Sequence, residues 1–157
     1  MDVGQVLANW IHTVAFVIAW GYYGILGRIV IPGLRDLDSA AAARTLDAIE
    51  RRALPLILIA VVAFVVTGSY LLTVNDQYQG LGNLAASTWT VMLTVKHVVI
   101  VALVALAVVI DYLIHRAGDP VEDRARRRRI FEVRVAAEAA TALGAVIVLL
   151  TAIAQAS

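Results

Sequence analysis

The chain has 157 residues, of which 61% are hydrophobic and only 16% are charged, and its mean hydropathy is +0.84. A water-soluble domain is closer to half apolar and a quarter charged, so this composition predicts a protein covered by lipid. The absence of cysteine excludes disulfides, thiolate metal sites and cysteine nucleophiles.

Four apolar segments are long enough to cross about 30 Å of hydrocarbon, which takes about 20 helical residues. In chain order they lie near residues 6–31, 54–74, 89–114 and 133–154. Asp38 or Ser39 is expected to cap a short helix leading into the second segment, and Asp119 with Pro120 to begin one before the fourth. We see no repeat or domain boundary. The sequence therefore predicts an all-α fold, a single transmembrane domain over residues 1–157 built as an up-and-down four-helix bundle.

The positive charges predict the orientation of this bundle. Twelve of the thirteen Lys and Arg residues lie in or beside the first and third connections, and the middle connection and both termini carry none. The positive-inside rule then places both basic connections in the cytoplasm and both termini outside, for a multi-pass protein of the inner (plasma) membrane. The run "RARRRR" at residues 124–129 is interpreted as a topology determinant that contacts anionic headgroups, so lipid and not nucleic acid is the expected partner.

Two histidines interrupt the apolar segments at similar depth. With both termini on one side, the first and third segments run in the same direction, and His12 and His97 lie about one helical turn or less apart in depth. These segments are diagonal neighbours in an up-and-down bundle. Two imidazoles facing each other across a core can ligate a haem iron axially, so His12 and His97 are the predicted metal ligands. Hydrogen bonding across the helices is the structural alternative.

Helical periodicity indicates which residues share a face with these histidines. The face of His97 also carries Thr90, Val101, Val104, Val108, Asp111 and His115, and we expect this face to point inward. Gly68 and Gly144 lie at comparable depth in the second and fourth segments. Small residues there allow either close helix packing or a slot for a flat cofactor.

Three further titratable residues lie in or at the end of the third span: Lys96, Asp111 and His115. Lys96 lies about 100° around its helix from His97 and is expected to extend outward, either to the headgroups or to a haem propionate or an anionic substrate. Asp111 is expected to pair with a nearby arginine such as Arg116. His115, at the boundary of the span, needs no special role.

Three motifs carry a resemblance to known families. "NWIHTVAFVIAWGYYGILGRIVIPGLR" (residues 9–35) resembles the first helix of the copper-resistance protein D-like membrane domain, with an early His, a Trp-Gly pair and a Pro-x-Leu exit. "TGSYLL" (67–72) and "VKHVVIV" (95–101) look like the Thr-Gly and Lys motifs of that group's second and third helices. The overall pattern is also similar to the small haem-binding bacterial protoporphyrinogen oxidase family.

The resemblance implies either of two chemistries. In the oxidase-like reading, His12 is an axial ligand of haem b and Lys96 is needed for activity, which makes the chain a membrane oxidoreductase or electron-transfer protein. In the copper reading, soft ligands are scarce because the only methionines are Met1 and Met92. A b-type haem protein with a redox role is therefore our first hypothesis. A copper or metal homeostasis protein and a small structural subunit of a larger membrane complex are the alternatives, and a homo-oligomer or a redox partner subunit is left open.

Overall fold

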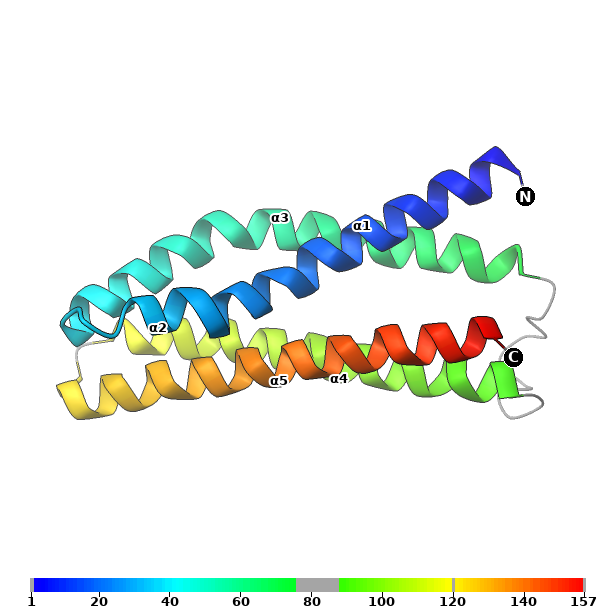
Figure 1. The fold of residues 1–157 in the computed structure, drawn as a ribbon. Helices are drawn as coiled ribbons and strands as arrows, with labels where there is room; N and C mark the ends of the chain where they lie inside the picture. Colours follow the sequence, from blue (N-terminus) through cyan, green and yellow to red (C-terminus); the bar gives the residue numbers. More distant parts are fainter. Residues whose placement is uncertain (1, 76–87, 120, 157) are drawn as a thin grey trace.

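The computed structural model describes residues 2–75, 88–119 and 121–156 of the chain. These residues form four long helical rods that lie side by side (Figure 1), without a strand among them. The first rod consists of α1 (Val3–Ile25), the π-helical turn η1 (Leu26–Val30) and α2 (Ile31–Gly33). The others are α3 (Ser39–Thr73), α4 (Thr88–Ala117) and α5 (Asp123–Ala156).

Each rod contains a stretch that is long and apolar enough to cross a membrane: Val3–Gly33, Ser39–Thr73, Thr90–Ala117 and Asp123–Ile153. Long apolar side chains such as Ile59, Val101 and Leu149 stand exposed along the rods, as lipid-facing side chains do. The chain is thus an integral membrane protein in composition and architecture. The predicted all-α, up-and-down four-helix bundle is confirmed.

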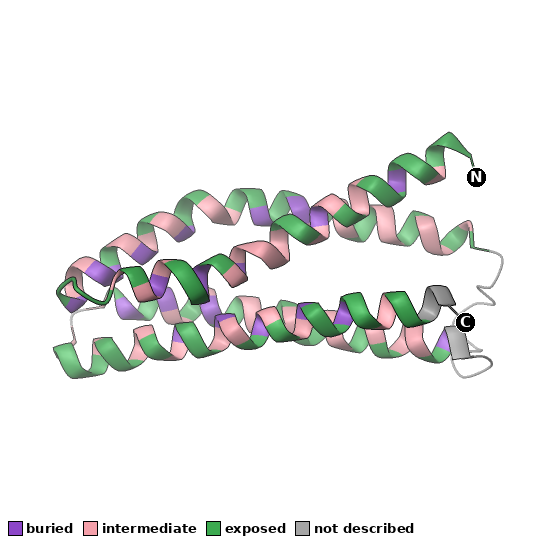
Figure 2. Ribbon diagram, viewed as in Figure 1, coloured by how far each residue is buried: buried purple, intermediate pink, exposed green. Residues whose placement is uncertain are grey.

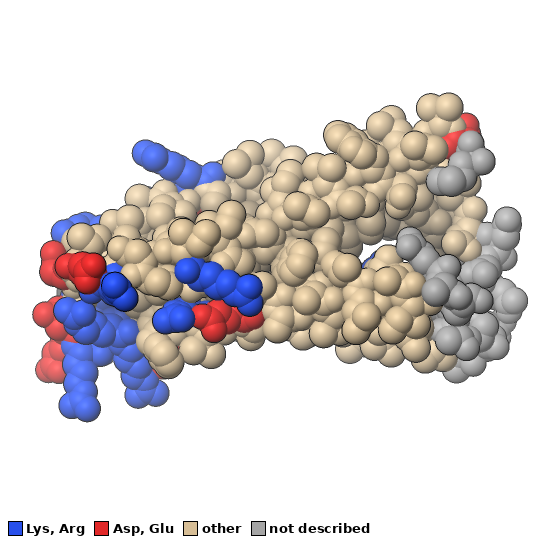
Figure 3. Space-filling model, in the orientation of Figure 1, with Lys and Arg blue, Asp and Glu red and all other residues tan. Residues whose placement is uncertain are grey.

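The two ends of the bundle differ in charge. The terminal end carries the start of α1, the end of α3, the start of α4 and the end of α5 (Figure 1). The basic end carries the connections at residues 34–38 and 118–122. In the view of Figure 3, Lys, Arg, Asp and Glu side chains gather at the basic end, as the charge distribution along the sequence predicts.

The helix starts at the basic end follow the predictions only in part. Asp38 caps α3 as expected, because its carboxylate accepts a hydrogen bond of 2.8 Å from the Ala41 N–H. The short helix predicted before the second span is continuous with it, since α3 passes through Pro55 without a break. The predicted start at Asp119 is wrong: α5 begins at Asp123, and Pro120 lies outside the described residues. Asp119 instead lies two residues beyond the end of α4, where its N–H donates to the Arg116 carbonyl at 3.4 Å.

Packing joins the rods in two antiparallel pairs, α1 with α3 and α4 with α5, and α1 with η1 also packs on α5. The buried core lies in the half of the bundle nearer the basic end and includes Leu26, Leu46, Ile110, Ile114 and Val133, all fully buried. Burial, coloured in Figure 2, is sparse in the half nearer the terminal end. The two pairs are therefore held together at the basic end, and this leaves space between them at the other.

The inward face predicted for α4 is wrong over most of its length. Val101, Val104 and Val108 are exposed, while Ile110 and Ile114 are completely buried. The physical reason is that α4 is apolar all round, so its hydrophobic pattern does not distinguish a side that faces lipid from a side that faces helices.

Candidate functional site

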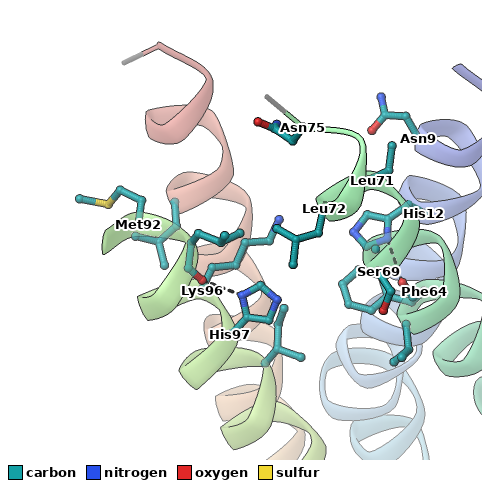
Figure 4. A pocket seen from close by; sticks show the side chains of 15 residues that line it. Asn9, His12, Phe64, Ser69, Leu71, Leu72, Asn75, Met92, Lys96 and His97 are labelled. Atoms are coloured by element: carbon teal, nitrogen blue, oxygen red, sulfur yellow. Dashed lines mark hydrogen bonds between the residues drawn. The ribbon is translucent and has the colours of Figure 1, made fainter. Parts of the chain in front are cut away.

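A pocket of about 430 Å³ lies between the helix pairs, in the half of the bundle nearer the terminal end. We call it the terminal pocket; Figure 3 shows a hollow at this end of the molecule, and Figure 4 shows the side chains from close by. It is lined by two residues of α1, six of α3, five of α4, one of α5 and Asn75: Asn9, His12, Phe64, Val65, Gly68, Ser69, Leu71, Leu72, Asn75, Met92, Leu93, Lys96, His97, Ile100 and Leu150. His12, His97, Lys96 and Gly68, all predicted from the sequence as site residues, thus line one cavity.

His12 enters the pocket from α1 and is held against α3. Its Nδ1–H donates to the Phe64 carbonyl at 3.0 Å and lies 3.2 Å from the Thr67 hydroxyl oxygen. The imidazole stacks on the Phe64 ring, with the ring centroids 4.0 Å apart and the planes 18° from parallel. Because a carbonyl oxygen only accepts, Nδ1 carries the hydrogen of the neutral ring and Nε2 keeps its lone pair.

Gly68 makes this position of the His12 ring possible. A Cβ at residue 68 would lie 2.9 Å from Cε1 of His12, closer than two carbons can approach without a shift. Alanine in place of Gly68 would therefore push the imidazole away from α3. Of the two uses predicted for Gly68, the structure shows the close approach of a neighbouring helix.

His97 enters the pocket from α4, on the wall opposite to His12 (Figure 4). Its Nδ1–H donates to the Leu93 carbonyl one turn earlier, at 2.7 Å. The same tautomer follows as for His12, with the lone pair on Nε2. In Figure 4 the second ring nitrogen of each histidine lies on the side that faces the other histidine. Two imidazole lone pairs are therefore presented to one cavity.

The side chain of Lys96 does not take the direction predicted from the sequence. Its side chain lines the terminal pocket and extends toward Leu72 of α3, with its amine end between the two imidazoles in the view of Figure 4. The expected outward path to the headgroups is not taken. Because the pairs α1–α3 and α4–α5 stand apart at this level, the cavity accommodates the long stem and its ammonium.

Sequence reasoning missed several lining residues. Phe64, which supplies both the stacking ring and the acceptor carbonyl for His12, was not singled out, although its spacing of four residues from Gly68 places both on one face of α3. Asn9 and Met92 also line the pocket. The Met92 sulfur is turned away from the imidazoles in Figure 4.

Gly144 lies outside the terminal pocket. The space in front of it is filled by the Trp20 indole, which a Cβ at residue 144 would overlap. The indole Nε1–H donates to the Thr141 carbonyl at 2.9 Å. A cofactor slot at Gly144 is therefore not what the structure shows, and this glycine lets an aromatic side chain of α1 pack against α5.

A second group of polar side chains lies nearer the basic end. Glu50 of α3 is only 3% exposed and accepts a hydrogen bond from the Tyr22 hydroxyl of α1. Sequence reasoning missed Glu50, although it falls on the same helix face as the buried Leu46. The predicted Asp111–Arg116 pair is wrong: Asp111 lies 3.4 Å from Nδ1 of His115, and Arg116 stacks over the Tyr112 ring.

Within the described ranges, no three His, Cys, Asp or Glu side chains come together in a group that could hold a metal ion. The described lining of the terminal pocket contributes two imidazoles and no carboxylate. The remaining lining residues are mostly apolar, with Asn9, Ser69, Asn75 and Lys96 as the polar ones.

The fold and the pocket define a polytopic helical membrane protein with a histidine-bearing cavity between its helices. Comparison with known proteins adds the family: the model of the family described as Copper resistance protein D matches residues 47–154, and the chain belongs to this family. The match covers α4 and most of α3 and α5, and with them Lys96 and His97, whereas His12 on α1 lies outside it. No curated protein and no solved structure matches the chain. The resemblance to copper resistance protein D is thus confirmed, and the similarity to the haem-binding oxidase family is not among the findings.

Proposed function

We propose that this protein handles copper in the membrane, and that a copper ion, as cargo, binds in the terminal pocket to the Nε2 atoms of His12 and His97. The observation that carries the proposal is that the histidines of two separate helices line one cavity, in a chain of the copper resistance protein D family. This corresponds to the second hypothesis drawn from the sequence, with the histidine pair retained from the first.

The donor atoms suit copper. Neutral imidazole nitrogen is a common ligand of both copper oxidation states. Each ring is oriented by a hydrogen bond from its Nδ1–H to a backbone carbonyl, an arrangement that typically fixes the tautomer of a metal-binding histidine. Leu72, Leu93 and Leu150 contribute apolar walls to the pocket.

The orientation belongs to the same proposal. Because all twelve arginines lie toward the basic end, the positive-inside rule supports a cytoplasmic basic end and an outer terminal end in the inner membrane. The terminal pocket then lies in the outer half of the bilayer, where it receives copper from outside the cell or releases it there.

Binding of haem b, with a redox role, is the second candidate function. The favourable observation is the same pair of imidazoles on opposite walls, with the Lys96 amine between them as a partner for a propionate. The packing at Gly144 argues against haem, because the indole of Trp20 fills the space that a flat macrocycle would need there.

The test is copper binding by the detergent-purified protein. Copper(I) is added under reducing, anaerobic conditions in competition with a chromogenic chelator, for wild type, His12→Ala, His97→Ala and His115→Ala. We expect one copper ion per chain in wild type and in His115→Ala, whose residue is exposed near the basic end. We expect an affinity lower by about a hundredfold or more in each pocket variant, because one of two ligands is lost.

Equal affinity in all four proteins contradicts the proposal. A reduced-minus-oxidised absorption spectrum of the same wild-type preparation tests the second candidate. A sharp Soret band that disappears in both pocket variants would favour haem over copper.

A further inference from the structure

Among the described residues that line the terminal pocket, Lys96 is the one lysine or arginine, and none is an aspartate or glutamate. Among the described residues, no carboxylate lies within ion-pair distance of its ammonium, because none of the ion pairs between described side chains includes it. Its side chain lines the same cavity as His12 and His97. Among the described side chains, none therefore offsets the positive charge that a cation at the two Nε2 atoms would experience.

We propose that Lys96 is a charge filter, which makes the terminal pocket select the singly charged copper(I) ion over doubly charged ions. The inference rests on the proposed function, since it assumes that His12 and His97 bind a metal ion. It names the oxidation state of the cargo and the residue that determines it.

The physical basis is that Coulomb repulsion scales with the charge of the incoming ion. If the ammonium–metal separation is taken as about 8 Å and the effective dielectric constant as about 20, a fixed positive charge weakens binding about thirtyfold for a monovalent ion and about a thousandfold for a divalent one. Two imidazoles by themselves would favour divalent zinc or copper, which bind strongly to nitrogen ligands. A nearby ammonium changes this preference without contacting the ion.

The position of Lys96 fits such a role better than a purely structural one. A lysine that only anchors a helix end extends along apolar surface to the headgroups. Lys96 instead extends across the cavity from α4 toward Leu72 of α3, beside the side chain of His97 (Figure 4). The pocket thus holds an ammonium next to two metal-ligating groups, an arrangement that weakens metal binding in general and divalent binding most.

The experiment compares the affinities of copper(I) and zinc(II) at one pH, by chelator competition, in wild type, Lys96→Leu and Lys96→Arg. Leucine removes the charge without adding a metal-ligating atom, and arginine retains the charge. In Lys96→Leu we expect copper(I) to bind about thirtyfold more tightly and zinc(II) about a thousandfold more tightly, so that selectivity for copper(I) falls about thirtyfold. Lys96→Arg is expected to keep the wild-type ratio.

The outcomes separate this inference from the proposed function. If copper(I) binding depends on His12 and His97 but the ratio of the two affinities is the same in Lys96→Leu and wild type, the charge filter is refuted and the copper site remains. If neither ion binds in a histidine-dependent manner, both are refuted. Thermal unfolding and size-exclusion profiles of the variants establish that each is folded; Lys96→Arg supplies the ratio for a charged side chain if its profile matches wild type.

Discussion

Replacement of Gly144 by alanine tests the packing between the two helix pairs. The Trp20 indole occupies the position of the new Cβ, so the ring has to move and its hydrogen bond to the Thr141 carbonyl is lost. Loss of the bond costs about 0.5–1.5 kcal/mol, and forcing an extra methyl group into a packed interior costs about 1–3 kcal/mol. The better helix propensity of alanine returns about 1 kcal/mol. We therefore expect Gly144→Ala to lower the free energy of unfolding by about 0.5–3.5 kcal/mol.

Gly21→Ala is the matched control, because a Cβ at residue 21 meets nothing within 4 Å. We expect it to leave stability unchanged or to raise it by up to about 1 kcal/mol. The assay is unfolding of the detergent-solubilised protein by a denaturing detergent, followed by circular dichroism and by tryptophan fluorescence. If Gly144→Ala is as stable as Gly21→Ala, with unaltered fluorescence, the packing of Trp20 against Gly144 is not as described.

Two other predictions concern the half of the bundle near the basic end. Tyr22→Phe removes the donor to the buried Glu50 carboxyl, and we expect it to lower the free energy of unfolding by about 1–3 kcal/mol. In the Glu50→Leu background the same change should lower the free energy of unfolding much less. An equal loss in both backgrounds would contradict the hydrogen bond. The Ala41 N–H holds the pKa of the Asp38 carboxyl below its usual value, so the stability that this cap contributes is present above the unfolded-state pKa and is lost as the pH falls through the lower, folded-state pKa. The stability difference between wild type and Asp38→Ala should accordingly be constant near neutral pH and shrink below about pH 4, and a difference that grows on acidification would refute this linkage.

Much of the fold was predictable from the sequence. Each rod needs about 20 apolar residues to cross the hydrocarbon, and a helix satisfies its own backbone hydrogen bonds there, so the number and type of the spans follow from composition alone. The concentration of arginine beside two connections predicted which ends of the helices lie together. The Asp38 cap was also readable, because its carboxylate acts on a backbone N–H only three residues away.

The candidate site was predictable only as a set of residues. Polar side chains in long apolar segments are conspicuous, so His12, Lys96 and His97 could be named before their surroundings were known. Their depth agreed because helical rise is constant, and the structure lines one pocket with all three. The same pattern did not predict the direction of the Lys96 side chain or the packing of Trp20 against Gly144.

The sequence by itself determined the number of spans, the charged and uncharged ends and the identity of the polar side chains within the membrane. Only the tertiary structure decided which side of each helix meets another helix, as the exposed Val101 and the buried Ile110 of α4 show. The physical reason is that lipid and protein interior are equally apolar, so hydrophobicity does not select a face. Shape does: Trp20 fits against Gly144, and His12 fits against Gly68. The space that remains between the helix pairs is the pocket in which an ammonium and two imidazoles lie together.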